Sequence, residues 1–502
     1  MDLSSAVSAT VSTLRRRPAD LIPFYFLGTA VPVIARMGLF IALVGVYIHF
    51  EITGRLEDAR EAFTELELTP PDPENPEAIE AWAEGLRPAL EPLASQTALA
   101  LVTAGIFAFV LLMIFSYAAV SAGQMSAVVA RLRDERGLTA GIAGVRNRWL
   151  TFLGLYLAEF LLWVAVLVFG SIAIAVAFLV NPFVGAAVAL GVLLVGLVTL
   201  LAVRILFAFA PAAIVVDDVG VAASVSGAGG FIRSNPADAA AYLVVAVGVF
   251  VGISSAASAL TYLGGGAVVA LVSAVVVAPA LDLLKTVLYG DYRGTVDPVD
   301  PPETRLRDQF TGGVRRGWHE MIAFVGRTPG LHAITIFIGV GSGVLGWLAV
   351  EPFVGAITTS IEARLADHIA PVATLNFFGN NWAVAIATSL SGVALVIPAL
   401  SSIAFNGLVL GATAALEENL FVLIAFVVPH GIFEIPALFI SGALGIHLGL
   451  VSWRTFRGRL SRERFADVLE RAFWILMGIG VLLALAAVIE GFISPYYWQL
   501  FR

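Results

Sequence analysis

The sequence predicts an all-α, polytopic integral membrane protein, and three observations support this. Hydrophobic residues make up 59% of the 502 residues and charged residues only 13%, whereas soluble domains carry about 25% charged residues. The mean hydropathy is +0.92. The apolar runs are continuous rather than alternating, which excludes the pattern of a membrane β-barrel.

Eleven apolar stretches are candidates to cross a bilayer, which takes roughly 20 helical residues. They are residues 21–50, 97–124, 150–180, 183–215, 241–263, 267–288, 331–350, 381–397, 400–416, 421–451 and 468–493. The stretch 400–416 is short, so it either crosses the bilayer or re-enters it. The start of the chain lacks the short apolar core and cleavage site of a signal peptide.

Arginine placement predicts the orientation, because cytoplasmic loops carry an excess of basic residues. With eleven spans, four arginine groups fall on one side of the membrane. They are Arg15–Arg17, Arg131–Arg148, Arg305–Arg327 and Arg454–Arg464. We therefore expect a cytoplasmic N-terminus and an outer C-terminus in the plasma membrane.

A Pro/Asp-rich linker near residue 297 divides the chain into two predicted membrane domains. Residues 1–296 form a six-helix domain, and residues 297–502 form a five-helix domain that begins with an amphipathic cytoplasmic interfacial helix at 304–325. The outer loop 51–96 is rich in Asp and Glu, and the turn TPPDPENPE separates two amphipathic helices in it. A solvated acidic cap is favoured over a binding site for this loop.

Composition also limits the chemistry. The chain has no cysteine, so disulfides, thiolate nucleophiles and Cys-ligated metal sites are excluded. No basic tract indicates a nucleic-acid surface, and no motif indicates a cofactor. Lys285 is the single lysine and the net charge is −8, which favours a haloarchaeal source over a GC-rich bacterium.

The stretch 421–452 contains ionisable groups inside an apolar run. His430 and Glu434 are four residues apart and so share one helix face. A charged group at bilayer depth costs at least roughly 2.5 kcal/mol. Pro429 and Pro436 flank the pair and weaken the helix there. This pattern locates a site but does not identify its role.

Asparagines extend this predicted site. Asn406 lies about as far before the turn at 416–421 as His430 lies after it, so an antiparallel pair of helices would bring them together, with Asn380 or Asn381 near the outer mouth. A structural polar lock, a substrate or ion site, and a metal or catalytic centre all stay open. His430 and Glu434 are weak metal candidates, because zinc sites usually need three protein ligands.

A second polar group is predicted in the first half. Glu159 and Arg204 are nearly equidistant from the turn at Asn181, and Arg36 reaches a similar depth in the first span. A structural ion pair is favoured over an anion or lipid-headgroup site. Gly339 and Gly343 form a GxxxG pair, for which packing within the chain is favoured over a homo-oligomer seam.

The C-terminal half resembles the stage II sporulation protein M family. The matching residues are Asn380-Asn381-Trp382, Asn406-Gly407 with Gly411, the segment Pro429-His430-Gly431-Ile432-Phe433-Glu434, and Ser441-Gly442 with Gly445. The resemblance implies a membrane anchor for peptidoglycan-degrading partners, or a broader scaffold in an archaeal cell. Residues 210–216 and 219–235 resemble the membrane domain attached to some glycerophosphodiester phosphodiesterases, without the soluble catalytic domain.

Two functions follow as hypotheses. The first is an envelope scaffold or anchor that contacts membrane lipids and a membrane or envelope protein partner. The alternative is a transporter or lipid-handling protein that uses the polar cluster as its substrate or ion site. The enzyme signal is weak, because no HExxH motif, serine triad order or phosphate-binding loop occurs.

Overall fold

The computed structural model describes residues 2–64, 76–262, 266–296, 301–351, 354, 358–365 and 368–501. Within these ranges no β-strand occurs, and β-pairing is limited to isolated bridges such as the one between Thr359 and Glu417. Ten of the described helices are long and apolar enough to cross a membrane. These features confirm an all-α, polytopic membrane protein.

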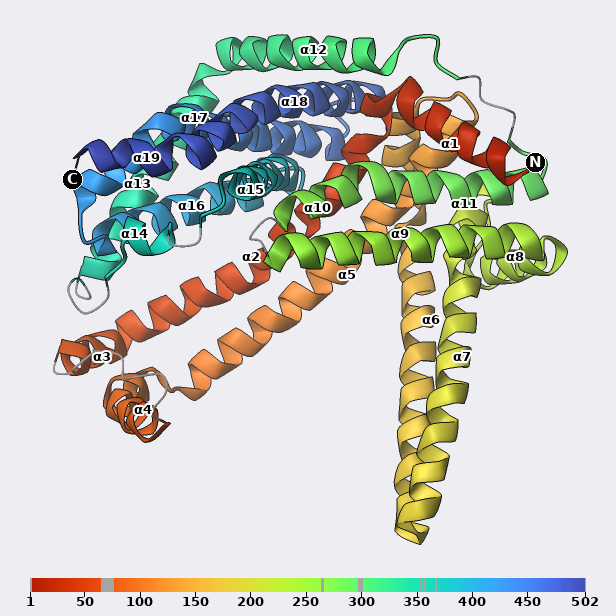
Figure 1. Ribbon diagram of the computed structural model, residues 1–502, viewed down its shortest axis with the longest axis horizontal. Coiled ribbons are helices and arrows are strands. Elements are labelled where there is room, and N and C mark those ends of the chain that lie inside the picture. Colours follow the sequence, from red (N-terminus) through yellow and green to blue (C-terminus); the bar gives the residue numbers. More distant parts are fainter. Residues whose placement is uncertain are drawn as a thin grey trace.

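The helices follow one another along the chain as Figure 1 labels them. Those of the first half are α1 (Leu3–Arg16), α2 (Ile22–Ile52), α3 (Arg55–Thr64), α4 (Pro76–Leu90), α5 (Gln96–Leu132), α6 (Gly137–Val180), α7 (Pro182–Val216), α8 (Val221–Ser234), α9 (Pro236–Tyr262), α10 (Ala267–Val272) and α11 (Ala278–Tyr292). Those of the second half are α12 (Leu306–Arg327), α13 (Pro329–Val350), α14 (Ile361–Arg364), α15 (Ala370–Ser391), α16 (Ile397–Leu416), α17 (Leu420–Phe456), α18 (Arg462–Phe492) and α19 (Ser494–Tyr497).

One predicted span needs a correction. The stretch 381–397 was expected to cross the membrane, but α15 covers Ala370–Ser391 and is not among the ten candidate spans. The apolar residues after Ser391 form a turn instead, in which Leu395 and Val396 both have φ of 72°. Composition does not distinguish apolar residues in a turn from apolar residues in a helix. The predicted span therefore lay closer to the C-terminus than α15 does. The short stretch 400–416 belongs to a full helix, α16.

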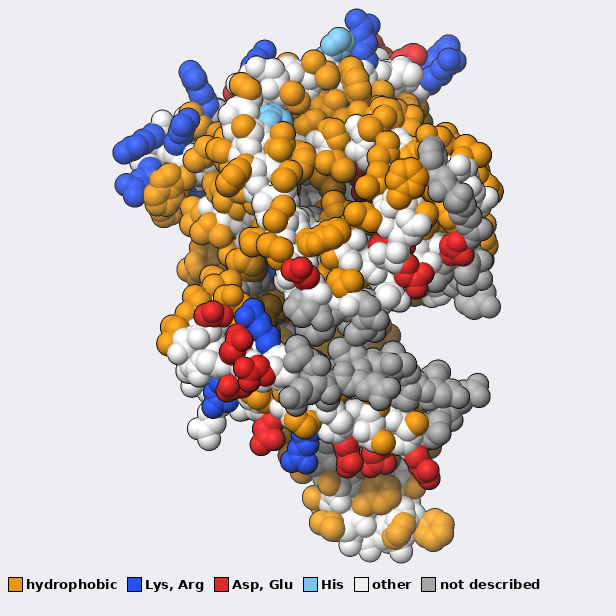
Figure 2. Space-filling view, turned by 90° about the vertical axis from the view of Figure 1, so that its left-hand side faces the viewer, with side chains coloured by type: hydrophobic (Ala, Val, Ile, Leu, Met, Phe, Trp, Pro, Cys, Tyr) orange, Lys and Arg blue, Asp and Glu red, His pale blue; other side chains and the backbone are white. Residues whose placement is uncertain are grey.

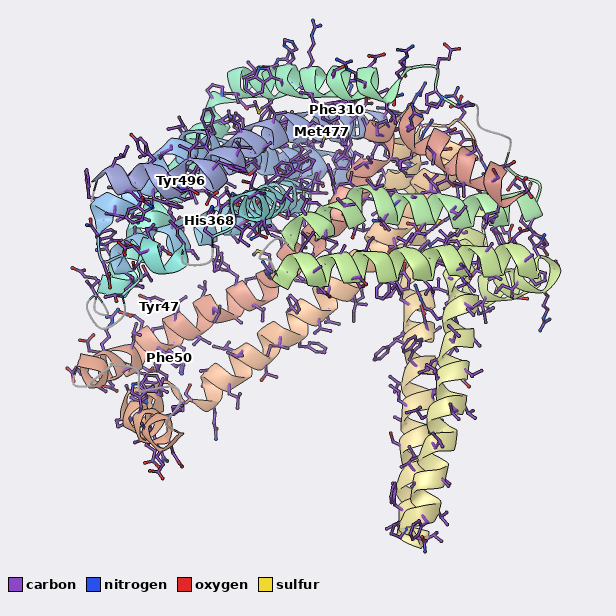
Figure 3. All side chains as sticks on the ribbon, viewed as in Figure 1. Tyr47, Phe50, Phe310, His368, Met477 and Tyr496 are labelled. Atoms are coloured by element: carbon purple, nitrogen blue, oxygen red, sulfur yellow. The ribbon has the colours of Figure 1, made fainter. Side chains whose placement is uncertain are left out.

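Two helical hairpins extend from the body of the protein (Figure 1). One consists of α2 and α5 and carries α3 and α4 at its far end, where Tyr47 and Phe50 lie (Figure 3). The other consists of α6 and α7, and only 6% and 0% of their most apolar windows are buried inside the protein. Side chains point away from both edges of this second hairpin in Figure 3, and many exposed residues of α6 and α7 are large and apolar. Both hairpins therefore expose surfaces that only lipid or another membrane protein can cover.

The acidic loop forms the two predicted helices, α3 and α4, although most of the turn between them lies outside the described residues. Asp and Glu side chains gather in the lower half of Figure 2, and many Lys and Arg side chains lie at its upper margin. This separation of charge agrees with a solvated acidic cap at the end of the α2–α5 hairpin.

One continuous buried core contains residues from both halves of the chain. The ring of Phe26 in α2 packs against Trp382 in α15 and Phe473 in α18, with centroid distances of 6.3 Å and 5.9 Å. The predicted interfacial helix is α12, and it lies along α18, where the Arg316 guanidinium stacks 4.5 Å from the Trp474 ring centroid. The division into two domains stays a prediction.

Gly346 extends the face of α13 that carries Gly339 and Gly343, and this face packs inside the chain, with Gly343 and Gly346 against α16 and Gly339 against α17. A Cβ atom on Gly346 would lie 2.1 Å from the carbonyl oxygen of Leu408, whereas one on Gly341 would meet nothing within 4 Å. We expect Gly346→Ala to lower the free energy of unfolding by about 1–3 kcal/mol through overpacking, measured by denaturation in mixed micelles. Gly341→Ala is the matched control on the same helix. Equal stability of the two variants would contradict this close packing.

Candidate polar site in the second half

The site forms in the part of α17 that contains two prolines and remains helical through both. Pro429 and Pro436 lie inside this 37-residue helix. Neither proline has an N–H group to donate to the carbonyl four residues earlier, so the helix is weakened on both sides of the segment between them. His430 and Glu434 project from this segment. The same helix that crosses the apolar region therefore presents two polar side chains one turn apart.

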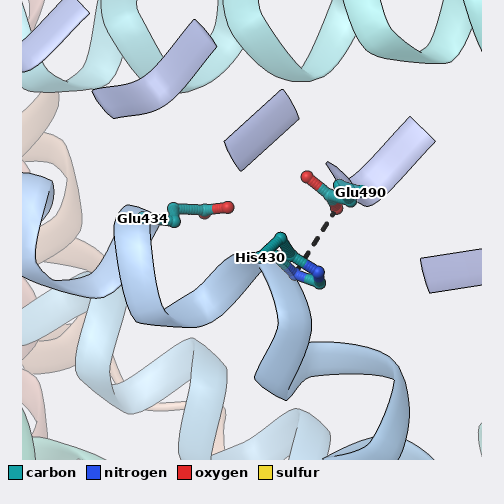
Figure 4. A group of neighbouring side chains, drawn as sticks. All are labelled: His430, Glu434 and Glu490. Atoms are coloured by element: carbon teal, nitrogen blue, oxygen red, sulfur yellow. Dashed lines mark ion pairs between the residues drawn. The ribbon is translucent and has the colours of Figure 1, made fainter. Parts of the chain in front are cut away.

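The tertiary structure adds residues from the end of the chain to this pair. Glu490 lies near the end of α18, and its Oε1 is 4.0 Å from Nε2 of His430. The other imidazole nitrogen, Nδ1, is 3.0 Å from Oγ of Ser494 at the start of α19. One ligand-type atom from each of His430, Glu434 and Glu490 lies within 4.8 Å of the others. The three side chains point toward one another (Figure 4).

The cluster is shielded from its surroundings. The side chains of His430 and Glu490 are 7% and 13% exposed. The ring of Phe426 packs edge-on against the imidazole at a centroid distance of 5.5 Å. Oε2 of Glu490 is buried and has no hydrogen-bond partner among the described residues. A buried polar atom without a partner costs free energy, so this oxygen is available to a proton or a ligand.

No basic side chain balances the two carboxylates. Among the described residues, neither Glu434 nor Glu490 pairs with a Lys or Arg side chain, and the basic group closest to Glu490 is the His430 imidazole, 4.0 Å away. Buried carboxylates are normally paired, protonated or bound to a metal. The arrangement can therefore hold protons, a cation or a cationic group of a ligand.

Asn406 is not brought to His430. Its side-chain amide donates to the carbonyl of Ser402 on its own helix, at 2.8 Å. The contacts of α16 with α17 place Ile403 against Gly442. Continuing that antiparallel register puts Asn406 about two and a half helical turns from His430. The prediction assumed that residues equally distant from the turn at 416–421 lie opposite each other. The first turns of α17 instead pack against α14 and the C-terminal segment.

The other two asparagines lie in the middle of α15 rather than at an outer mouth. The Asn380 amide donates to the side-chain oxygen of Asn381 at 3.2 Å, and neither bonds to His430 or Glu434 among the described contacts. They follow Gly379, at which α10 approaches so closely that a Cβ would lie 2.5 Å from the backbone nitrogen of Val268. Their position next to a helix contact favours a packing role.

Sequence reasoning missed Glu490 and Ser494. A signal for Glu490 existed, because it is the only acidic residue after Glu470 and stands within an apolar run. That signal is the same one that identified Glu434. Ser494 carried no such signal, because serine is common in apolar helices and its partner is 64 residues away in the sequence.

The second predicted polar group is partly assembled. Nη1 of Arg204 lies 3.0 Å from Oε1 of Glu159, and their side chains are 62% and 15% exposed. Arg36 on α2 is exposed and does not join them, and it has no ion-pair partner in the part of the chain that the structure describes. Arg36 is therefore a charged residue near the middle of the apolar helix α2, without an ion-pair partner among the described residues.

These features define a multi-pass helical membrane protein with a buried polar cluster in its second half. Residues 333–495 match the family model described as stage II sporulation protein M. The matched segment includes His430, Glu434, Glu490 and Ser494, and it confirms the resemblance found for the C-terminal half. No curated protein and no solved structure matches the chain. The resemblance of the first half to phosphodiesterase-associated membrane domains stays a prediction.

Proposed function

We propose that this protein is a scaffold of the cell envelope that holds partner membrane proteins against its two projecting hairpins. The observation that carries the proposal is the exposure of arginine in these hairpins. Arg36 has no ion-pair partner among the described residues, and the Arg204 side chain is 62% exposed although it is paired. Both residues lie well inside helices that are apolar enough to span a membrane.

Exposed arginine at bilayer depth is unfavourable without a partner. Its cost is roughly 2.5–3.5 kcal/mol on insertion scales. A guanidinium has five N–H donors, and the Arg204 guanidinium makes one hydrogen bond, to Glu159. A carboxylate on a neighbouring transmembrane helix would neutralise Arg36, and a carboxylate or hydroxyl would accept hydrogen bonds from the remaining donors of Arg204. The class of partner is therefore a membrane protein with an acidic or hydroxyl-bearing helix.

The orientation is part of the same proposal. The two termini lie at opposite ends of the molecule, and α3 and α4 lie toward the end that carries the C-terminus (Figure 1). When α15 is counted as an eleventh membrane helix, all four arginine groups fall on one side, and this arrangement supports a cytoplasmic N-terminus and an outer acidic cap. We propose the plasma membrane as the location. In this proposal residues 1–296 present the hairpins, and residues 297–502 form the sporulation-protein-M-like platform.

Replacing Arg36 tests the proposal. We expect Arg36→Leu to reduce recovery of the co-purifying membrane protein at least about tenfold, which corresponds to 1.4 kcal/mol of lost binding. The measurement is quantitative mass spectrometry of tagged protein after cross-linking in native membranes. Arg315→Leu, which removes an exposed arginine from α12, is the matched control.

Equal recovery with Arg36→Leu and Arg315→Leu would contradict the scaffold proposal. A differently tagged copy of this chain could be recovered with the wild-type protein and with Arg315→Leu but not with Arg36→Leu. That result would identify the partner as a second copy of this protein.

A second candidate function is a transporter or lipid-handling protein. The specific observation that favours it is the buried cluster at the proline-weakened segment of α17, because transporters place substrate sites at interrupted helices near the membrane midplane. Proton uptake into proteoliposomes that His430→Gln abolishes would favour this alternative, since glutamine does not titrate. A scaffold tolerates the same change.

A further inference from the structure

We propose that His430, Glu434 and Glu490 together bind one divalent transition-metal ion, of the zinc or manganese class. The inference goes beyond the scaffold function and does not depend on it. It rests on four features of the cluster: its donor atoms, its charge, the orientation of its imidazole and its position between helices.

The donor atoms are suitable in kind and in spacing. Imidazole nitrogen and carboxylate oxygen both bind zinc at about 2.0–2.2 Å, so neighbouring ligand atoms around one ion are about 3–4 Å apart. In this protein the three ligand-type atoms lie within 4.8 Å of one another, and the distance from Nε2 of His430 to Oε1 of Glu490 is 4.0 Å. Small side-chain rotations bring all three into the range of one ion.

Charge balance favours a divalent ion. Two ionised carboxylates and a neutral imidazole carry a charge of −2, and no Lys or Arg pairs with either glutamate in the described structure. A divalent ion neutralises the site, and Oε2 of Glu490, which has no hydrogen-bond partner in the part of the chain that the structure describes, becomes available as a ligand. Protonation of both acids is the competing way to remove the charge.

The imidazole is oriented as in known metal sites. Ligating histidines usually donate their second ring N–H to an oxygen, which sets the tautomer. Nδ1 of His430 lies 3.0 Å from Oγ of Ser494. Donation from Nδ1 to this hydroxyl leaves the lone pair of Nε2 directed toward Glu490. The 4.0 Å separation of Nε2 and Oε1 is too long for a hydrogen bond, so Nε2 has no hydrogen bond with Glu490 that would compete with a metal ion.

The donor set also selects the class of metal. Calcium takes six to eight oxygen ligands, and magnesium keeps several waters. One imidazole with two carboxylates suits zinc, manganese or ferrous iron instead. Three protein ligands would leave at least one coordination position open to water or to an oxygen ligand, as in catalytic rather than structural zinc sites.

The position of the cluster predicts a structural effect of the metal. His430 and Glu434 belong to the proline-flanked segment of α17, and Glu490 belongs to the end of α18. One ion bound to all three joins these helices next to α19. A ligand that binds only the folded state raises stability by mass action, so metal-loaded protein should melt at a higher temperature than chelator-treated protein.

The test uses full-length protein in detergent, stripped with a chelator and then equilibrated with Zn²⁺ alone or Mn²⁺ alone. Metal retained after desalting is measured by mass spectrometry. We expect about one equivalent on the wild-type protein. Glu490→Gln and Glu434→Gln should each weaken binding at least tenfold, and Ser494→Ala by about 10–100-fold. His447→Gln on the same helix and Glu418→Gln before it are the matched controls, and both should bind as the wild-type protein does.

A monodisperse wild-type protein that retains neither metal would overturn the inference and identify the site as a proton-holding cluster. Equal binding by wild type and Glu490→Gln would overturn it as well. Because the wild-type protein is measured directly, a folding defect in any one variant does not decide the result. Partner recovery is also measured with metal-stripped protein. Arg36 is not part of the metal site, so the scaffold proposal and the metal proposal can fail independently of each other.

Discussion

Replacing Asp20 with alanine is expected to lower the free energy of unfolding by about 3–5 kcal/mol, the cost of breaking a buried ion pair. The Asp20 carboxylate accepts hydrogen bonds from the backbone N–H groups of Gly137 and Leu138, at 2.8 Å and 3.0 Å. These groups begin α6 and have no partner within their own helix. The same carboxylate lies 3.7 Å from Nε of Arg131, whose side chain is 1% exposed. The substitution leaves this buried guanidinium without its buried partner.

Asp238→Ala is a matched control for this prediction. Asp238 has the same place as Asp20 in a similar segment, since Pro-Ala-Asp occurs at both 18–20 and 236–238. It carries no comparable hydrogen bonds, and a change of no more than about 0.5 kcal/mol is expected. Stability is measured from the folded fraction as the detergent SDS replaces a mild one. Coincident unfolding curves for the two variants would show that Asp20 does not hold the start of α6.

Replacing Phe26 with alanine is expected to cost about 3–5 kcal/mol, the usual range for a buried phenylalanine. Phe26 is fully buried. Its ring lies in an edge-on contact with Trp382 and a stacked contact with Phe473. Both partners belong to the second half of the chain, so the cavity left by the substitution would lie at the contact between the halves.

Phe40→Ala is the control for Phe26. Phe40 is on the same helix but is 38% exposed, so its removal leaves no closed cavity. Phe26→Ala should shift the unfolding of tryptophan probes in both halves together, because the buried core is continuous across the predicted boundary. A shift confined to the first half, or an equal loss in Phe40→Ala, would contradict this coupling.

The two polar groups were predicted by the same kind of reasoning, with different outcomes. Counting residues from the turn at Asn181 predicted that Glu159 faces Arg204, and Nη1 of Arg204 lies 3.0 Å from Oε1 of Glu159 because α6 and α7 form one projecting hairpin whose register follows from the turn (Figure 1). The same counting failed for Asn406 and His430. The helix α16 packs closely against α13 through glycines such as Gly411, and the first turns of α17 pack against α14 and the C-terminal segment. Distance from the turn therefore does not determine which residues of α16 and α17 face each other.

The sequence by itself determined the class of the protein, the approximate spans and the presence of a polar site near His430 and Glu434. These properties depend on local composition and on helical periodicity, which a single segment carries. Only the tertiary structure decided that Glu490 and Ser494 complete the site, that Asp20 holds the start of α6, and that α2 packs on α15. Such contacts join residues far apart in the chain. No local sequence pattern specifies which apolar face of one helix packs against which face of another helix. The register of packed helices follows from side-chain shape and close glycine contacts, and these are settled only when all the helices are in place.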